Sequence, residues 1–304
     1  MGFLVGSTSP LQDKFRINMH RVYLIFIQLA VNAVFFTVSV FAQDVPIDEA
    51  VLECHFDLRE SRDTIGNRYA DDRMILRVGK VYSLFYSYYR YYADSLLNSE
   101  SGARVIKNEI LAAIRSGNPL NGPGARTTSD YLYKNYPEGY ITTRTLLMTS
   151  YVAYTEPYED QNWILCDSVK YVLEYCCQKA MCIFRGREYV AWYTPQIPIR
   201  EGPWKFHGLP GLIMEVYDSG NHYHYTATEM KIKDLEPVVL YDNPHHEAYQ
   251  KTTRIKYLHR KAAFYFQMNP QDVNALIGID LKGDKPAGQV QAVNLYDFIE
   301  RDYK

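Results

Sequence analysis

The hydrophobic pattern of residues 140–232 is that of successive short β-strands. Runs rich in aliphatic, aromatic and threonine residues alternate with turn residues such as Asp167-Ser168 and Ser219-Gly220-Asn221. Helical patterns do not come between these runs, which disfavours a parallel α/β fold. Short strands joined by hairpin turns predict an antiparallel sheet. The expected strands are 141–154, 162–165, 169–175, 182–185, 189–193, 212–218 and 223–232.

Three further strands are expected nearer the N-terminus, at 50–58, 74–79 and 81–92, and the last of these is dominated by tyrosine. The charged residues 59–72 indicate a loop. The chain holds 28 tyrosines, a residue typical of strands, where the ring packs and the hydroxyl stays hydrated. We interpret 81–92 as a long strand with aromatic cross-strand pairs. A platform for stacking sugars or peptides is the alternative interpretation.

The apolar period changes to that of a helix over residues 103–116. Ile106, Ile110 and Ile114 recur every fourth residue among polar ones, which predicts an amphipathic helix. The residues that follow, 117–139, are rich in Gly, Pro, Asn and Thr and indicate a loop.

A second helical segment is expected near residues 245–268, with Asn243 as its N-cap and Pro244 in its first turn. The fold class that results is mainly β (α+β). We expect an antiparallel sheet with about two helices, and a curved half-barrel packed against helix is one arrangement of it.

Residues 19–42 have the three parts of a secretory signal peptide. A basic stretch ends at Arg21, no charged residue follows before Asp44, and small residues occupy positions −3 and −1 of the segment that ends at Ala42. We expect cleavage after Ala42, with translation starting as late as Met19. An uncleaved membrane anchor is the alternative, because about 20 apolar residues can span a bilayer.

Cleavage would leave a single β-rich domain over residues 43–304, in the periplasm or secreted. Removing 42 of the 304 residues leaves 262, enough for a sizeable core. The removed segment carries a net charge of +2 and the whole chain −2, so the remainder carries −4. No part of it is strongly basic, and binding to nucleic acid therefore has no electrostatic support. Membrane contact is expected only through the signal segment, if that segment stays uncleaved.

All five cysteines lie in the part expected to be exported, at positions 54, 166, 176, 177 and 182. Disulfides are the default in an oxidising compartment, and an odd number leaves at least one thiol free or paired with another chain. Cys177 and Cys182 enclose a short loop, and we expect these two to be bridged. Their spacing is not C-x-x-C, which argues against a redox-active pair.

An irregular segment precedes the strand expected at 212–218. Pro203 restricts the backbone, and Pro210-Gly211 fits the two central positions of a type II turn. Trp204 and Phe206 are large side chains that would pack where the chain enters the strand. Trp204, Lys205, Phe206 and His207 are the candidate ligand-binding residues. The alternative is that this segment is only a tight turn with an aromatic plug.

Gly208-Leu209-Pro210-Gly211-Leu212-Ile213 is the hexapeptide after which the GLPGLI family is named, and the chain resembles that family. The resemblance covers roughly residues 70–235 and implies an exported, β-rich protein of the kind found mainly in Bacteroides-type bacteria. The family has no settled activity, so no catalytic residue is carried over. Other stretches that look like its pattern are Met74–Ser87, Tyr175–Ala180, Phe184–Arg187, Ala191–Tyr193 and Gly202–Phe206.

Histidine offers the best candidate for metal chemistry. His222 and His224 lie two residues apart in an expected strand, so their side chains share a face roughly 7 Å apart. With His207 and His245-His246 they suggest a metal site, and soft cysteine ligands would favour Cu or Zn. The alternative is a hydrated outer face of the sheet.

Familiar catalytic motifs are absent from the sequence: no G-x-S-x-G, H-E-x-x-H, P-loop or Rossmann fingerprint occurs. We therefore name no catalytic residue. The leading hypothesis is an exported envelope protein that binds a small ligand or an envelope partner without chemistry. An exported hydrolase without a local motif is the second hypothesis, and a metal-binding protein is the third. A deep polar cleft with convergent His, Asp or Ser would favour the hydrolase, and an apolar or tyrosine-lined groove would favour binding.

Overall fold

A computed structural model of the chain describes residues 44–63, 68–116, 128–147, 149–267 and 297–303. These described residues belong to one compact unit. The expected signal peptide lies outside the described residues. None of the helices in the described ranges is long and apolar enough to cross a membrane.

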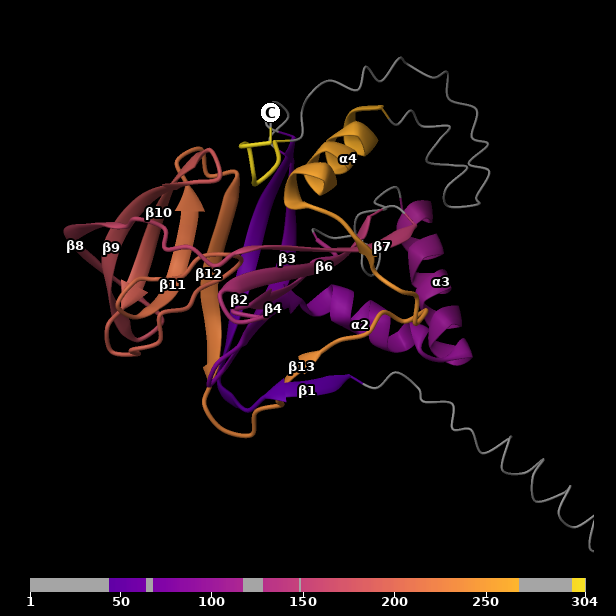
Figure 1. The fold of residues 1–304 in the computed structure, drawn as a ribbon, viewed down its shortest axis with the longest axis horizontal. Coiled ribbons are helices and arrows are strands. Elements are labelled where there is room, and N and C mark those ends of the chain that lie inside the picture. Colours follow the sequence, from indigo (N-terminus) through magenta and orange to yellow (C-terminus); the bar gives the residue numbers. More distant parts are fainter. Residues whose placement is uncertain (1–43, 64–67, 117–127, 148, 268–296, 304) are drawn as a thin grey trace, which may run out of the picture. The chain divides into compact units, whose positions relative to one another are not determined.

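The described chain is mainly β, with three helices (Figure 1). The helices are α2 (Tyr88–Leu97), α3 (Glu100–Arg115) and α4 (Arg254–Gln267). The strands are β1 (Val45–Asp48), β2 (Ala50–Asp63), β3 (Arg68–Gly79), β4 (Ser83–Ser87), β5 (Tyr131–Lys134), β6 (Tyr140–Leu147), β7 (Ser150–Pro157), β8 (Ile164–Val172), β9 (Tyr175–Phe184), β10 (Arg187–Thr194), β11 (Leu212–Asp218), β12 (Tyr223–Lys231), β13 (Val238–Leu240) and β14 (Gln250–Lys251).

Twelve of these strands form one sheet, in the order β14-β7-β6-β5-β4-β3-β2-β12-β11-β10-β9-β8. Every neighbouring pair is antiparallel except β14 with β7. β1 and β13 form a separate antiparallel pair. Within the described residues β8 and β14 are the two edges, so the sheet is not closed into a barrel. The predicted fold class, mainly β with an antiparallel sheet and a few helices, is confirmed.

Residues 59–63 and 68–72 of the charged stretch form strand rather than the predicted loop. β2 and β3 pair in register through this region, with Arg59 opposite Asp71 and Asp57 opposite Arg73. Opposite charges directly across an antiparallel pair stabilise it. The charged residues that indicated a loop therefore face each other across two paired strands.

Only the first part of the tyrosine-rich stretch 81–92 forms a strand, and the rest begins α2. β4 ends at Ser87, whose side chain accepts a hydrogen bond from the backbone N–H of Arg90 at 3.1 Å and so caps α2. All five residues of β4 are buried because both faces of the strand are covered. Phe85 faces the main core, and Leu84 and Tyr86 face a second cluster with Val238 and Tyr241.

Three further boundaries differ from the prediction. The stretch 141–154 is a hairpin of β6 and β7, and Asp167-Ser168 is a bulge within β8 instead of a turn. α4 begins at Arg254, not near residue 245, because the Asn243 side chain bonds to the backbone N–H and C=O of Glu247 and closes a local turn. The helix predicted over 103–116 is confirmed as α3, with Ile106 buried.

The predicted Cys177–Cys182 disulfide is wrong. Both residues lie in β9, where five residues of extended chain separate their Cα atoms by roughly 16 Å, far beyond the reach of a disulfide. All five cysteines are free. Burial raises the pKa of Cys177 to about 11 and that of Cys182 to about 12, so both remain unreactive thiols.

The main core lies on one face of the sheet, called here the inner face. It runs across β2–β4 and β9–β12, where Phe56, Leu76, Ala191 and Val216 are fully buried. The β10–β11 loop (residues 195–211) packs onto this face with Trp204, Phe206 and Leu209. The C-terminal segment (residues 297–303) is bonded to the same region through backbone and side-chain contacts.

Gly211 is the tightest point of the β10–β11 loop. A Cβ atom there would lie 2.1 Å from the backbone oxygen of Thr194, a contact that backbone movement alone can relieve. We predict that Gly211→Ala lowers the free energy of unfolding by about 3 kcal/mol. Gly139→Ala is the matched control, because Gly139 has φ +81° but open space around its Cβ position, and its cost should be only about 1–2 kcal/mol. Equal losses in urea unfolding would contradict this explanation.

Candidate functional site

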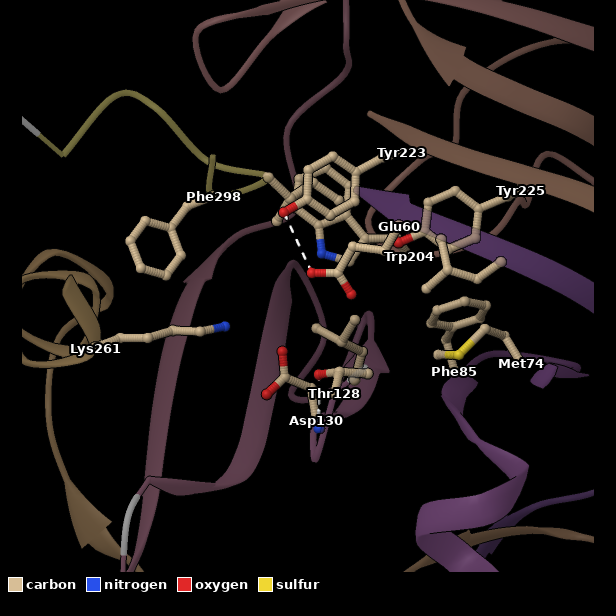
Figure 2. Close-up of a pocket in the computed structure, with 13 residues that line it drawn as sticks. Glu60, Met74, Phe85, Thr128, Asp130, Trp204, Tyr223, Tyr225, Lys261 and Phe298 are labelled. Carbon is tan, nitrogen blue, oxygen red and sulfur yellow. Dashed lines mark hydrogen bonds between the residues drawn. The ribbon is translucent and has the colours of Figure 1, made fainter. Parts of the chain in front are cut away.

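A small cavity lies against the inner face of the sheet, beside the main core (Figure 2). Its floor comes from neighbouring strands, with Leu58 from β2, Met74 from β3, Phe85 from β4 and Leu132 from β5. Its volume is about 50 Å³, room for roughly three to five water-sized groups. The site therefore accommodates a small molecule or the end of a side chain.

Four aromatic rings contribute to the remaining wall. Tyr223 and Tyr225 project from β12, Trp204 from the β10–β11 loop and Phe298 from the C-terminal segment. Tyr223, Tyr225, Trp204 and Phe298 are each no more than 5% exposed. Large aromatic walls with a few polar groups are typical of ligand pockets.

Trp204 is held in an unusual backbone conformation. Its φ is +49°, in the left-handed region that residues other than glycine avoid at a cost of about 1–2 kcal/mol. Edge-to-face contacts with Phe184 and Phe206, at centroid distances of 5.7 and 5.2 Å, hold the indole in place. Backbone strain of this kind often accompanies functional positions. Here it aims a tryptophan at the cavity.

Three charged side chains point into the cavity from separate parts of the chain (Figure 2). They are Glu60 in β2, Asp130 immediately before β5, and Lys261 in α4. Glu60 is only 3% exposed, and the Tyr223 hydroxyl donates to it at 3.5 Å. The Lys261 ammonium lies 5.8 Å from the centroid of the Phe298 ring.

Lys205 holds the surroundings of the cavity together although it does not line it. Its ammonium is 1% exposed, contacts the carboxylate of Glu156 and lies 2.6 Å from that of Glu300. Burial alone would raise the pKa of Glu300, but Lys205 and Arg254 outweigh burial and lower it. Glu300 therefore remains an anion in the interior of the protein.

The C-terminal segment is fixed by two further arginines. Arg254 at the start of α4 donates to Glu300 at 2.5 Å and to Asp302 at 2.7 Å. Arg187 donates to the backbone oxygens of Asp297 and Phe298 at 3.0 and 2.7 Å. These bonds place Phe298 at the wall of the cavity.

A second buried ammonium supports the β10–β11 loop. Lys134 is fully buried and donates to the Glu201 carboxylate at 2.7 Å and to the backbone oxygens of Gly202 and Phe206 at 2.6 and 3.0 Å. The Tyr158 hydroxyl donates to the other Glu201 oxygen at 2.8 Å. One lysine thus satisfies three acceptors of an irregular loop.

The four candidate ligand residues are placed in different environments. Trp204 lines the cavity, Lys205 lies in the ion network and Phe206 is fully buried in the core. His207 stacks on Tyr158 at a centroid distance of 3.9 Å. Burial lowers the pKa of His207, so its imidazole is neutral at pH 7.

The hexapeptide (residues 208–213) connects the β10–β11 loop to the start of β11. Leu209, Leu212 and Ile213 are no more than 1% exposed and belong to the main core. Gly208 has φ +93°, which favours glycine, and its backbone N–H donates to Arg200 at 3.0 Å. The hexapeptide therefore supports Trp204 from behind and does not itself line the cavity.

His222 and His224 pair with different carboxylates. His222 Nδ1 lies 3.0 Å from Asp297, and His224 Nε2 lies 2.7 Å from Glu215. Within the described ranges no cluster of three or more His, Cys, Asp and Glu side chains is arranged to hold a metal. The Cu or Zn site stays an untested hypothesis.

Among the described residues that line the cavity, Trp204 is predicted from the sequence and the charged ones are not. Glu60 falls in the stretch assigned to a loop, and Asp130 and Lys261 stand in polar surroundings without a motif. The alternation of His222-Tyr223-His224-Tyr225 was the available signal. The histidines of this pattern suggest a metal site, whereas its tyrosines line the cavity.

Comparison with known proteins adds little about activity. Residues 183–215, which include the hexapeptide, match the model of a family described as "Protein of unknown function (Porph_ging)". No curated protein matches this chain.

Similar solved structures are distant. The structure of PNGF-II in the P21 space group has a TM-score of 0.44 and 13% identity, over 70% of this chain and 33% of that one. The structure of PNGF-II in the C2 space group has a TM-score of 0.43 and 13% identity, over 69% of this chain and 32% of that one. An uncharacterized conserved protein from Thermus thermophilus has a TM-score of 0.30 and 9% identity, over 66% of this chain and 90% of that one. The chain thus spans about a third of the length of the PNGF-II structures.

Glu300 should make the stability of the protein sensitive to acid. Because its folded-state pKa lies below the ordinary 4.5, its stabilising effect is complete above pH 4.5 and is lost as the pH falls through the folded pKa. We predict that Glu300→Gln lowers the free energy of unfolding by about 2 kcal/mol at pH 7, and that this difference shrinks below pH 4.5.

Urea unfolding at pH 7 and at several values below pH 4.5 measures both effects. Glu188→Gln is the control, because Glu188 is exposed on β10 and should change stability little at any pH. A Glu300→Gln loss that is the same at every pH would contradict the lowered pKa.

Proposed function

We propose that this chain is an exported cell-envelope protein that binds a small ligand, or one side chain of a partner, in the cavity of the inner face. The observation that carries the proposal is the composition of that cavity, whose wall is mostly aromatic and aliphatic with a few convergent polar groups. Such a lining favours binding by burial of an apolar body and orientation by a few polar contacts. Trp204 and its strained backbone support the same conclusion.

Export is proposed on the pattern of residues 19–42, with its basic start, apolar centre and small-residue end. We also propose membership of the GLPGLI family. The family-model match over residues 183–215 supports it, because that match contains the hexapeptide.

A hydrolase is the second candidate, and the specific observation that favours it is the pair of carboxylates. Glu60 and Asp130 point into one cavity, as an acid and a base would. The cavity is small, and the described residues that line it include no Ser, Cys or His. Non-catalytic binding therefore fits the site better.

A second candidate surface for binding an envelope partner lies on β8 and β9, at the edge of the sheet. Val169 and Tyr171 on β8 are 62% and 73% exposed, and Ile183 on β9 is 76% exposed. Exposed apolar residues along an edge strand favour contact with another chain. This surface supports binding to a partner independently of the cavity.

Filling the cavity with a larger side chain should abolish binding without unfolding the protein. Thr128 lines the cavity and is half-buried. We predict that Thr128→Trp removes any ligand that co-purifies with the wild-type protein, seen by native mass spectrometry, and changes the free energy of unfolding by less than about 1.5 kcal/mol. Thr226→Trp is the matched control, since Thr226 is equally half-buried but lies on β12 with its side chain pointing away from the cavity.

Ligand retained in Thr128→Trp at the level of the control would place the binding site elsewhere. Turnover of ester or glycoside substrates that is lost in Asp130→Asn would replace the binding proposal with the hydrolase.

Export can be tested on the protein produced in its own host. We expect an intact mass in the soluble periplasmic or secreted fraction that corresponds to a chain beginning at Gln43. A chain that keeps residues 19–42 and sediments with membranes would establish the anchor instead.

A further inference from the structure

The C-terminal segment (residues 297–303) is held in the way that a bound peptide is held. It forms neither helix nor strand, and side chains of the sheet contact its backbone. The Tyr223 hydroxyl donates to the backbone oxygen of Asp297 at 2.8 Å, and Arg187 donates to that of Phe298 at 2.7 Å. Hydrogen bonds to the main chain are the part of peptide recognition that supplies affinity.

Two side chains of the segment, two residues apart, enter two separate sites. Phe298 is 5% exposed and lines the cavity (Figure 2). Glu300 is 3% exposed, and its carboxylate lies 2.6 Å from the Lys205 ammonium and 2.5 Å from the Arg254 guanidinium. Pockets for alternate side chains are the part of peptide recognition that supplies specificity. These two sites together select an aromatic residue followed, two residues later, by a carboxylate.

The groove that holds the segment is built by parts of the chain distant from it in sequence. Arg187 and Tyr223 belong to β10 and β12, and Lys205 to the β10–β11 loop. Residues 268–296, 29 in number, join α4 to the segment. A chain of that length spans up to about 100 Å when extended. The segment is therefore comparable to a ligand tethered to its own groove, where its effective concentration is on the order of millimolar.

The small cavity is the space that this segment leaves unfilled. Phe298 and Ile299 are part of the cavity lining. Without them the cavity would extend into the space that their side chains occupy. The enlarged groove would run from the floor of the cavity to the Lys205 ammonium, and it would accept an extended peptide instead of a single small group.

We propose that this groove binds an extended segment of another protein, in which a phenylalanine is followed two residues later by a glutamate. The chain's own C-terminal segment is the built-in competitor of that partner. This inference rests on the proposed binding function and names the chemistry of the partner. In the complex, the partner's phenylalanine replaces Phe298, and its glutamate accepts hydrogen bonds from Lys205 and Arg254.

A second copy of this chain fits the groove less well than a different protein. Two copies that exchange their C-terminal segments replace each contact by an identical one. Association nevertheless costs translational and rotational freedom. A different protein can compensate for that cost with contacts that the resident segment does not make.

A labelled peptide measures the competition. We would titrate the full chain into a fluorescein-labelled peptide with the sequence of residues 297–303 and follow fluorescence polarisation at pH 7. Glu300→Gln in the chain weakens the resident segment at Lys205, whereas the peptide still carries its glutamate. We expect the peptide to bind the Glu300→Gln chain at least about tenfold more tightly than the wild-type chain, because the tethered competitor is weakened.

Matched variants separate competition from a general loosening of the fold. Glu188→Gln, at an exposed position of β10, should bind the peptide as weakly as the wild type. A peptide that itself carries Glu300→Gln should lose the gain, since Lys205 would stay without that carboxylate. Asp302→Asn weakens the resident segment from its rim, because the Asp302 side chain is 31% exposed and contacts Arg254 at 2.7 Å. It should give a gain of about threefold, and it provides the same comparison if Glu300→Gln does not fold.

The results decide between the occupants. Equal peptide binding by the wild-type, Glu300→Gln and Asp302→Asn chains would overturn the inference, and so would equal binding of the two peptides. A wild-type dimer that excess peptide dissociates would make a second copy the occupant and overturn the separate partner. If the peptides fail while Thr128→Trp still removes a co-purified ligand, the peptide inference falls alone. If the peptides fail and that ligand is retained, the proposed function falls with it.

Discussion

One buried ammonium ties three distant parts of the chain together. Lys205 of the β10–β11 loop meets Glu156 at the end of β7 and Glu300 of the C-terminal segment, and all three side chains are no more than 4% exposed. A charge in such surroundings is stable only when it is paired, and the loss of one partner leaves the other charges uncompensated. The sheet, the loop and the C-terminal segment therefore hold their positions jointly.

The cavity is a consequence of that constraint. The neighbouring strands β2, β3, β4 and β5 give it a floor and β12 gives part of its wall, but irregular segments contribute further wall residues. The loop presents Trp204, and the C-terminal segment presents Phe298. Lys134 fixes the loop from one side through Glu201, and Lys205 fixes it from the other. Buried lysines thus provide the order that hydrogen-bonded ladders provide elsewhere in the sheet.

The sequence predicts the regular parts of this structure much better than the site. Strand composition and turn residues located β11 and β12 almost to the residue, and the isoleucine period located α3. The prediction failed where polar groups are satisfied by partners distant in sequence, as at the cross-strand pair of Arg59 and Asp71. It also failed where one capping residue changes the structure, as at Ser87.

Four short elements, β5, β13, β14 and α2, have too few residues to show a period of their own. The cavity joins Glu60, Asp130 and Lys261 across 201 residues of sequence, and no local pattern links them.

Hydrogen exchange of a Lys205→Met variant tests the central claim most directly. If Lys205 holds the C-terminal segment and the loop in place, amides of residues 297–303 and 201–208 should lose protection together, while β11 and β12 keep theirs. Retained protection in both segments, with the free energy of unfolding unchanged, would contradict the account. The cavity walls would then be held by apolar packing alone.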